Sequence, residues 1–211
     1  NEIAMIFQEP MTAFSPVYTI GNQISEMVAL HTGLDRTKTR DRVVGLLNRV
    51  GISNPSQRYD QYPHELSGGM RQRAMIALAL SCNPKIILAD EPTTALDVTI
   101  QAQILDLLRE LQSEQGMSVV YITHNMAVIA ETVDRVYVMY LGQVVESTTT
   151  QQLFADPLHP YTQKLLRSIP KPGERVERLE VISGTVPAPI DLPRQCGFVS
   201  RCPHAMPGLC D

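Results

Sequence analysis

Residues 86–97 read IILADEPTTALD, and this stretch decides the fold. Four apolar residues, 86–89, are followed directly by two carboxylates, Asp90 and Glu91, and then by Pro92. A short, continuous apolar run that stops at turn residues is typical of a strand buried on both faces, as in a parallel sheet. Ligands of such sheets bind at the carboxyl ends of the strands. Asp90 and Glu91 are therefore expected at a ligand-binding edge.

Two other apolar runs end with a polar side chain in the same way. Residues 3–7 are followed by Gln8, and residues 118–123 are followed by His124. Segments with the apolar period of amphipathic helices separate the runs, over residues 20–50, after Ser67 and after Asp97. This alternation of strand and helix predicts an α/β fold with a parallel sheet. Gln8, Asp90, Glu91 and His124 are then expected at one edge of it.

The residue types at this edge suit phosphate chemistry. Mg²⁺ prefers hard oxygen ligands and keeps several waters, which suits Asp90. Glu91 can take the proton from a water that attacks a γ-phosphate, and His124 can contact that phosphate or orient Glu91. The alternative is two solvated charges and a structural histidine. Their position directly after buried runs favours the functional interpretation.

A second group of residues, LSGGMRQR at 66–73, suits an anion. Gly68 and Gly69 fall in the first turn of a predicted helix, where each glycine costs about 1 kcal/mol relative to alanine. Bare N–H groups beside the Ser67 hydroxyl form a phosphate-binding helix end. A flexible loop before a core helix is the alternative.

Composition divides the chain and limits its partners. Most of the 15 prolines lie after Asp156, so we expect a core over residues 1–155 and an extension over residues 156–211. Lysine and arginine total 18 against 22 aspartate and glutamate, a net charge of -4 that argues against a nucleic-acid partner. No apolar run approaches the roughly 20 residues of a membrane span.

Three motifs in this order, LSGGMRQR, ILADEPTTALD and YITH, resemble the signature, Walker B, D-loop and switch-histidine motifs of ATP-binding cassette (ABC) transporter ATPases. Residues 3–24 resemble the Q-loop and helical subdomain of oligopeptide and dipeptide importers, and DPLHPYT at 156–162 resembles their C-terminal extension. The resemblance implies a P-loop NTPase-like ABC core with a parallel central sheet. It also implies an α-helical subdomain at about residues 10–80 and a Pro-rich C-terminal extension.

The resemblance also implies roles for individual residues. Glu91 would be the general base and His124 the switch, while Gln8 would sense the attacking water and Mg²⁺. Asp90 would hold Mg²⁺ through water. Contacts to the ATP of the opposite subunit would come from Ser67, Gly68, Gly69 and Asp97.

By the same resemblance, the chain is expected to hydrolyse ATP in an importer of peptides or a related small solute. Its expected partners are a second ATPase subunit, identical or different, transmembrane permease subunits and, indirectly, an extracytoplasmic solute-binding protein. It would lie peripherally on the cytoplasmic face of a bacterial inner membrane. The alternatives are a non-transport ABC ATPase and a degenerate regulatory subunit that only completes a partner's ATP site.

One family motif, the Walker A pattern G-x-x-x-x-G-K-[ST], does not occur in the sequence. This chain alone is therefore not expected to hydrolyse ATP. Because Asn1 begins inside a predicted strand, the expectation is truncation, and natural degeneration is the alternative.

The cysteines gather at the end of the chain, where Cys196, Cys202 and Cys210 lie close enough in sequence to share one metal centre. Similar cysteines in peptide-importer ATPases imply a [4Fe-4S] cluster, so these three are expected to be cluster ligands. Zinc, with His204 as a further ligand, is the alternative. Cys82 is expected to be a small buried apolar residue.

Overall fold

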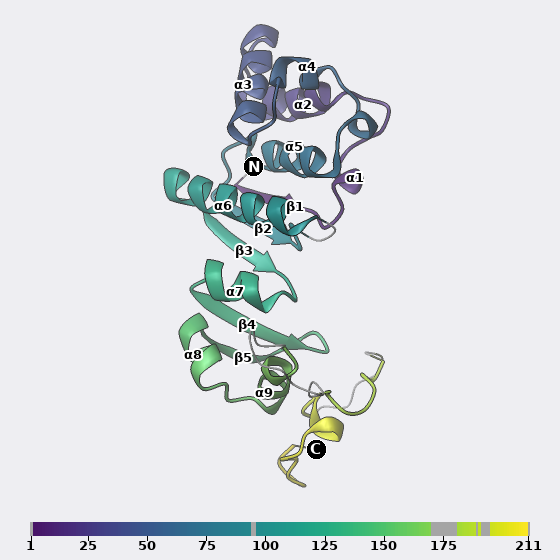
Figure 1. Ribbon diagram of the computed structural model, residues 1–211, viewed down its shortest axis with the longest axis vertical. Coiled ribbons are helices and arrows are strands. Elements are labelled where there is room, and N and C mark those ends of the chain that lie inside the picture. The colour runs from purple at the N-terminus through teal and green to yellow at the C-terminus, as the bar shows by residue number, and fades with distance from the viewer. Residues whose placement is uncertain (1, 94–95, 170–180, 189, 191–194, 211) are drawn as a thin grey trace. The chain divides into compact units, whose positions relative to one another are not determined.

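A computed structural model describes residues 2–93, 96–169, 181–188, 190 and 195–210 (Figure 1). The chain divides into two compact units, Asn1–His124 and Asn125–Asp211. The domain boundary predicted from composition, after residue 155, stays a prediction. Several prolines on which it rests lie outside the described residues: Pro170, Pro172, Pro189 and Pro193.

A three-stranded parallel sheet forms the centre of the first unit. Its order is β1 (Ile3–Ile6), β2 (Ile86–Asp90) and β3 (Ser118–Ile122). The register pairs Ile6 with Ala89 and Ala89 with Tyr121, so the three carboxyl ends lie level. The predicted parallel sheet is confirmed. Polar residues that follow the strands are thereby brought to one edge.

Helices pack against the face of this sheet on which Ile6, Ile87 and Ala89 are fully buried. Figure 1 shows α6 lying across the strands, with α2, α3 and α4 clustered beyond α5. Side chains cap the start of two of them: the Ser67 side chain accepts the N–H of Met70, and the Asp97 side chain accepts the N–H of Ile100. The helices are α1 (Pro10–Ala13), α2 (Ile20–Thr32), α3 (Arg36–Arg49), α4 (Pro55–Tyr59), the 3₁₀ turn η1 (Pro63–Glu65), α5 (Gly68–Leu80) and α6 (Val98–Gln115).

Close packing joins α2 to α4. A Cβ on Gly21 would come within 2.2 Å of the Tyr59 ring, so only glycine lets that ring lie against α2. The Tyr59 hydroxyl lies 2.8 Å from the Ser25 hydroxyl, and the Arg40 guanidinium lies 4.1 Å from the ring centroid. Arg40 also pairs with Asp60 at 3.0 Å.

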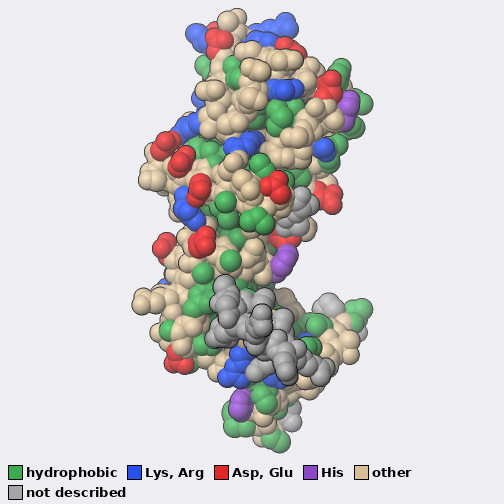
Figure 2. Space-filling view, in the orientation of Figure 1, with side chains coloured by type: hydrophobic (Ala, Val, Ile, Leu, Met, Phe, Trp, Pro, Cys, Tyr) green, Lys and Arg blue, Asp and Glu red, His purple; other side chains and the backbone are tan. Residues whose placement is uncertain are grey.

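Acidic and basic side chains are interspersed over the visible face of this unit (Figure 2).

An antiparallel hairpin forms the centre of the second unit. Leu141 and Gly142 connect its strands with φ values of 48° and 76°, as two-residue turns that match strand twist require. The elements are α7 (Met126–Thr132), β4 (Arg135–Tyr140), β5 (Gln143–Thr149), α8 (Thr150–Ala155), α9 (Pro160–Arg167) and the 3₁₀ turn η2 (Val199–Arg201).

Glu146 on β5 holds the start of α9. Its side chain is 9% exposed, and its two oxygens accept the backbone N–H groups of Leu158 at 2.9 Å and His159 at 3.0 Å. Burial acts to raise the pKa of Glu146, but these N–H groups, together with Thr162 and the charge of His159, outweigh it, and the pKa lies below its ordinary value. The His159 ring caps α9 by accepting the N–H of Tyr161. The histidine-proline-tyrosine segment is thus anchored to the hairpin.

Glu146→Gln should lower the free energy of unfolding of the second unit by about 1–3 kcal/mol near pH 7, because two N–H groups lose a charged acceptor. The folded pKa of Glu146 is depressed, so its contribution is present above the unfolded pKa of about 4.3 and is lost as pH falls through the folded pKa. Urea unfolding at pH 7 and below pH 4 measures this. The wild type should lose more stability than Glu146→Gln over that interval, with the exposed Asp134→Asn as control. Parallel pH profiles for wild type and Glu146→Gln would contradict the assignment.

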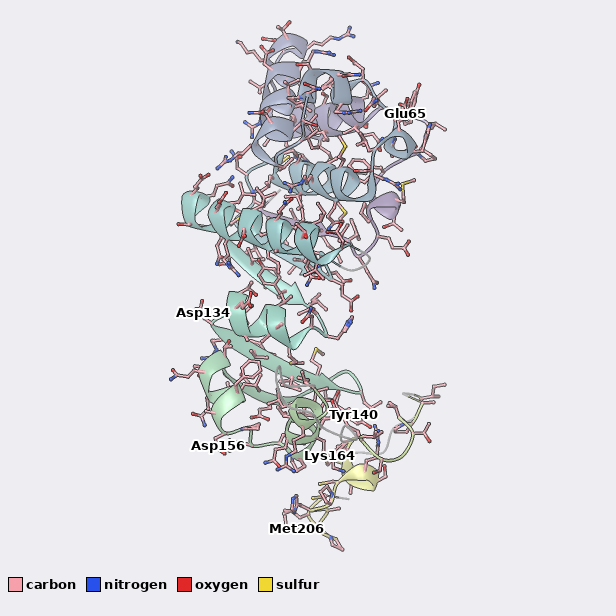
Figure 3. The ribbon with its side chains drawn as sticks, viewed as in Figure 1. Glu65, Asp134, Tyr140, Asp156, Lys164 and Met206 are labelled. Carbon is pink, nitrogen blue, oxygen red and sulfur yellow. The ribbon has the colours of Figure 1, made fainter. Side chains whose placement is uncertain are left out.

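Aromatic packing anchors the C-terminal loop within the second unit. Phe198 is fully buried, with its ring centroid 5.3 Å from that of Tyr140 and 5.5 Å from that of Tyr161. Arg201 donates to the Tyr140 hydroxyl at 3.1 Å, and the Lys164 ammonium donates to the Arg201 carbonyl at 3.2 Å. Tyr140 and Lys164 are labelled in Figure 3, where both lie beside the C-terminal segment.

No helix in the described part of the chain combines the length and the apolar character that crossing a membrane requires.

Candidate functional site

Three of the predicted site residues meet at the carboxyl edge of the parallel sheet. Gln8 Nε2 donates to Glu91 Oε2 at 2.8 Å, and His124 Nδ1 lies 2.6 Å from Glu91 Oε1. The side chains of Glu91 and His124 are 19% and 80% exposed. Each residue follows a different strand, so the level strand ends bring together positions that are far apart in sequence. Both carboxylate oxygens of Glu91 are thereby held in place.

Glu91 has an unusual backbone. Its φ is 43°, in the left-handed region that residues other than glycine rarely adopt. The Glu91 N–H donates to the Ile122 carbonyl at 2.8 Å, which ties the residue to the end of β3. Such conformations persist only where the surroundings impose them, and they concentrate at functional sites. The turn that directs this carboxylate is therefore a constrained feature of the fold.

The arrangement supports proton transfer. An ionised carboxylate only accepts hydrogen bonds, so the Nδ1–H of His124 and the amide of Gln8 both donate to Glu91. Two donors hold the carboxylate in one orientation, and a carboxylate held in this way can act as the base that takes a proton from a water molecule. The roles predicted for these residues stay predictions.

Asp90 lies next to Glu91 as the last residue of β2, and its side chain is half-buried. Mg²⁺ in phosphate-binding sites is typically held by one or two carboxylates together with waters and phosphate oxygens. A single aspartate at this edge, with the Gln8 side chain arriving from β1, fits that donor set. Asp90 as a magnesium ligand stays a prediction.

The two glycines at the start of α5 differ in their surroundings. A Cβ on Gly68 would have no neighbouring atom within 4 Å, whereas a Cβ on Gly69 would lie 3.2 Å from Ile100 Cγ2 of α6. Close packing against Ile100 therefore explains why residue 69 is a glycine, whereas Gly68 faces open space. The N–H groups of this helix end remain suited to a phosphate.

The predicted residues thus fall into two groups. Gln8, Glu91 and His124 are joined by hydrogen bonds. Ser67 and Asp97 instead cap the N-termini of α5 and α6, two helix ends that meet where Gly69 contacts Ile100. The contacts predicted between these caps and an ATP of the opposite subunit stay predictions.

The sequence analysis missed Gln72. This glutamine lies on α5 and is 2% exposed, and its Nε2 donates to the carbonyl of Pro92, the residue that follows Glu91. The sequence did carry a signal for this contact, because Gln72 is a polar residue one turn into a helix that is otherwise apolar on its buried side. A buried amide needs a hydrogen-bond partner.

The metal centre predicted in the C-terminal loop is wrong. Among the described residues, which include all three cysteines, no three His, Cys, Asp or Glu side chains are grouped to hold a metal ion. The Sγ atoms of Cys202 and Cys210 accept the N–H groups of His204 at 3.4 Å and Met206 at 3.5 Å. The Cys196 N–H donates to the Cys210 carbonyl at 2.9 Å. The sulfurs of Cys202 and Cys210 thus face the backbone of their own turns. Neither a [4Fe-4S] cluster nor a zinc site is supported.

Two protein-family models match the chain. Residues 1–94 match the model described as ABC transporter. Residues 145–210 match the model described as the C-terminal region of oligopeptide/dipeptide transporters.

Relatives with curated names match over almost the whole chain. A putative peptide import ATP-binding protein of Brucella ovis is 55% identical over 98% of this chain and 63% of its own length. The oligopeptide transport ATP-binding protein AppD of Bacillus subtilis has the same identity and coverage. The dipeptide transport ATP-binding protein DppD of Escherichia coli is 52% identical over 97% of this chain and 62% of its own length. The chain thus spans less than two thirds of these relatives.

Two solved structures of ATP-binding proteins are also similar to the chain. The structure of cbiO1 from Clostridium perfringens, part of the ABC transporter complex cbiONQ, matches with a TM-score of 0.63 and 31% identity, over 74% of this chain and 60% of that one. A dimer of the ATP-binding cassette MJ0796, bound to ADP and Pi in a post-hydrolysis state, matches with a TM-score of 0.63 and 30% identity, over 71% of this chain and 63% of that one.

Proposed function

Residues 1–94 belong to the ABC transporter family and residues 145–210 to the oligopeptide/dipeptide transporter C-terminal region, and on that basis we propose that the chain is part of the ATP-hydrolysing subunit of a peptide importer. One observation carries the chemistry: Glu91 is held by Gln8 and His124 at the carboxyl edge of the sheet. The similarity to peptide, oligopeptide and dipeptide transport ATP-binding proteins supports the substrate class.

In this proposal Glu91 is the general base of ATP hydrolysis. Its carboxylate takes a proton from the water that attacks the γ-phosphate. Gln8 and His124 orient that carboxylate through their hydrogen bonds, at 2.8 Å and 2.6 Å. The His124 ring is 80% exposed, so it would also be accessible to a phosphate.

Asp90 and Gln8 would hold Mg²⁺, which supplies charge neutralisation to the transferred phosphate. The open helix end at Ser67, Gly68 and Gly69 would receive the phosphate bound by a second ATPase subunit. Asp97, at the start of α6, would contact the same nucleotide across the dimer.

The proposed setting is a dimer of ATPase subunits, identical or different, that works with transmembrane permease subunits on the cytoplasmic face of the inner membrane. An external solute-binding protein would take part indirectly by delivering the peptide. Closure on ATP and reopening on hydrolysis would drive the permease by rigid-body motion.

Uptake of a labelled dipeptide and a labelled oligopeptide by cells, with and without the gene that encodes this chain, tests the proposal. Loss of uptake on deletion, restored by the intact gene, is the expected result. The complete polypeptide should also hydrolyse ATP in the presence of Mg²⁺, and this hydrolysis should stop when EDTA removes the metal. Unchanged uptake of both peptides would contradict the substrate class, and ATP hydrolysis without any uptake defect would favour a non-transport ABC ATPase.

A further inference from the structure

Gln72 is a buried polar residue in an apolar setting. It is 2% exposed on α5, while Met75 and Ile76 on the same helix are 1% and 0% exposed. Burying a side-chain amide is unfavourable unless its polar atoms are paired. Gln72 Nε2 is paired with the carbonyl oxygen of Pro92, a residue that is itself buried. The bond therefore joins α5 to the turn that follows β2.

This turn contains the strained backbone of Glu91. A φ of 43° is unfavourable for glutamate, and the proline that follows restricts Glu91 further. On one side, the Glu91 N–H is held by the Ile122 carbonyl at 2.8 Å. On the other side, Gln72 holds the carbonyl of Pro92, the residue after Glu91. The bond from Gln72 thus fixes the backbone that directs the carboxylate.

The same helix begins at the proposed phosphate-binding end. Ser67 caps α5, and Gln72 lies little more than one turn further along the helix. An α-helix moves as a stiff body over this distance, so a shift of its N-terminus carries Gln72 with it. A hydrogen bond from Arg73 to the side-chain oxygen of Gln103 ties α5 to α6, and Gly69 lies close to Ile100. A change at Ser67 is thus connected mechanically to Pro92.

We propose that Gln72 is a positioning residue that couples the N-terminus of α5 to Glu91. This proposal rests on the proposed function. A phosphate of the partner subunit's nucleotide, bound at Ser67, would adjust the position of this subunit's own general base through Gln72 and Pro92. The two ATP sites of the dimer thereby influence each other through one side-chain amide.

Gln72→Met tests this link, because methionine keeps the volume and removes the donor. In the complete polypeptide, kcat for ATP hydrolysis should fall about 10-fold to 100-fold, with KM for ATP changed less than about twofold, since positioning and not binding is lost. The Glu91 amide should exchange with deuterium roughly fivefold faster or more without nucleotide. Gln163→Met is the matched control, since Gln163 Nε2 donates to the Pro157 carbonyl at 2.9 Å in the second unit. It should change neither quantity.

Coupling to Ser67 has its own test. If Gln72 transmits the state of the helix end, the effects of Ser67→Ala and Gln72→Met on kcat should be smaller in combination than the product of the two single effects. If kcat of the double variant falls by the full product of the two single effects, the coupling is overturned.

Gln72→Glu provides a second variant with nearly the same shape. An ionised carboxylate cannot donate to the Pro92 carbonyl, whereas the protonated acid can. Its activity relative to wild type should therefore rise as pH is lowered, and a ratio that is constant with pH would overturn the proposal even if Gln72→Met fails to fold.

The amide exchange separates this proposal from the proposed function. If the wild-type polypeptide hydrolyses no ATP, the proposed function fails, while exchange at Glu91 still tests whether Gln72 holds this turn. Unchanged exchange at Glu91 in Gln72→Met, or an equal loss of kcat in Gln163→Met, would overturn the positioning role.

Discussion

Glu91→Gln should lower kcat for steady-state ATP hydrolysis by about 10²–10⁴-fold, the usual contribution of a general base. The structure indicates that this variant keeps its geometry. The amide oxygen of a glutamine can accept from Gln8 Nε2, and its N–H₂ group can donate to a neutral His124 Nδ1, so both hydrogen bonds survive. What disappears is the carboxylate that receives a proton from water.

Two measurements check this prediction in the complete polypeptide: phosphate release at saturating ATP and the dissociation constant for ATP. The affinity should be retained, because the change removes a proton acceptor and no nucleotide contact. Glu110→Gln, at an exposed glutamate on α6, is the matched control and should hydrolyse ATP like the wild type. Hydrolysis within twofold of wild type in Glu91→Gln would remove Glu91 from its assigned role.

His124→Ala should have the second-largest effect, a fall in kcat of about 10²-fold or more, because the Nδ1 contact at 2.6 Å orients the carboxylate of Glu91. The ring is 80% exposed, so its removal leaves no cavity, and the free energy of unfolding should change little. This combination of lost activity and retained stability separates His124 from a structural histidine.

Phosphate release and urea unfolding of the same preparation measure the two quantities. His31→Ala, at an exposed histidine in the last turn of α2, is the control and should leave both unchanged. A loss of stability in His124→Ala as large as its loss of activity would indicate a structural role instead.

Local patterns predicted the framework of the first unit well, because strands and helices are set by apolar periodicity and by capping residues. The runs ending at Gln8, Asp90 and His124 became the three parallel strands. Ser67 and Asp97 cap the two helices that were expected to follow them. In the second unit, the pattern missed α8 and α9, which are short, and α9 depends on Glu146 for the anchoring of its first turn.

The C-terminal cysteines show where spacing fails. Three cysteines within a short stretch predict a shared ligand, but spacing says nothing about the direction of each Sγ. That direction depends on the turns, in which Cys202 and Cys210 accept backbone N–H groups two and four residues away. The loop itself is held by Phe198 and Arg201, whose partners Tyr140 and Tyr161 come from distant elements of the unit.

By itself, the sequence determined which residue types stand at the carboxyl ends of the strands and at the starts of the helices, since those positions follow from local periodicity. Only the tertiary structure decided that Glu91 adopts a φ of 43° and that both its oxygens are engaged by residues that follow other strands. It also decided that Gln72 reaches Pro92. Contacts of this kind join residues 20 or more positions apart, and they depend on the packing of helices and strands, which no local pattern records.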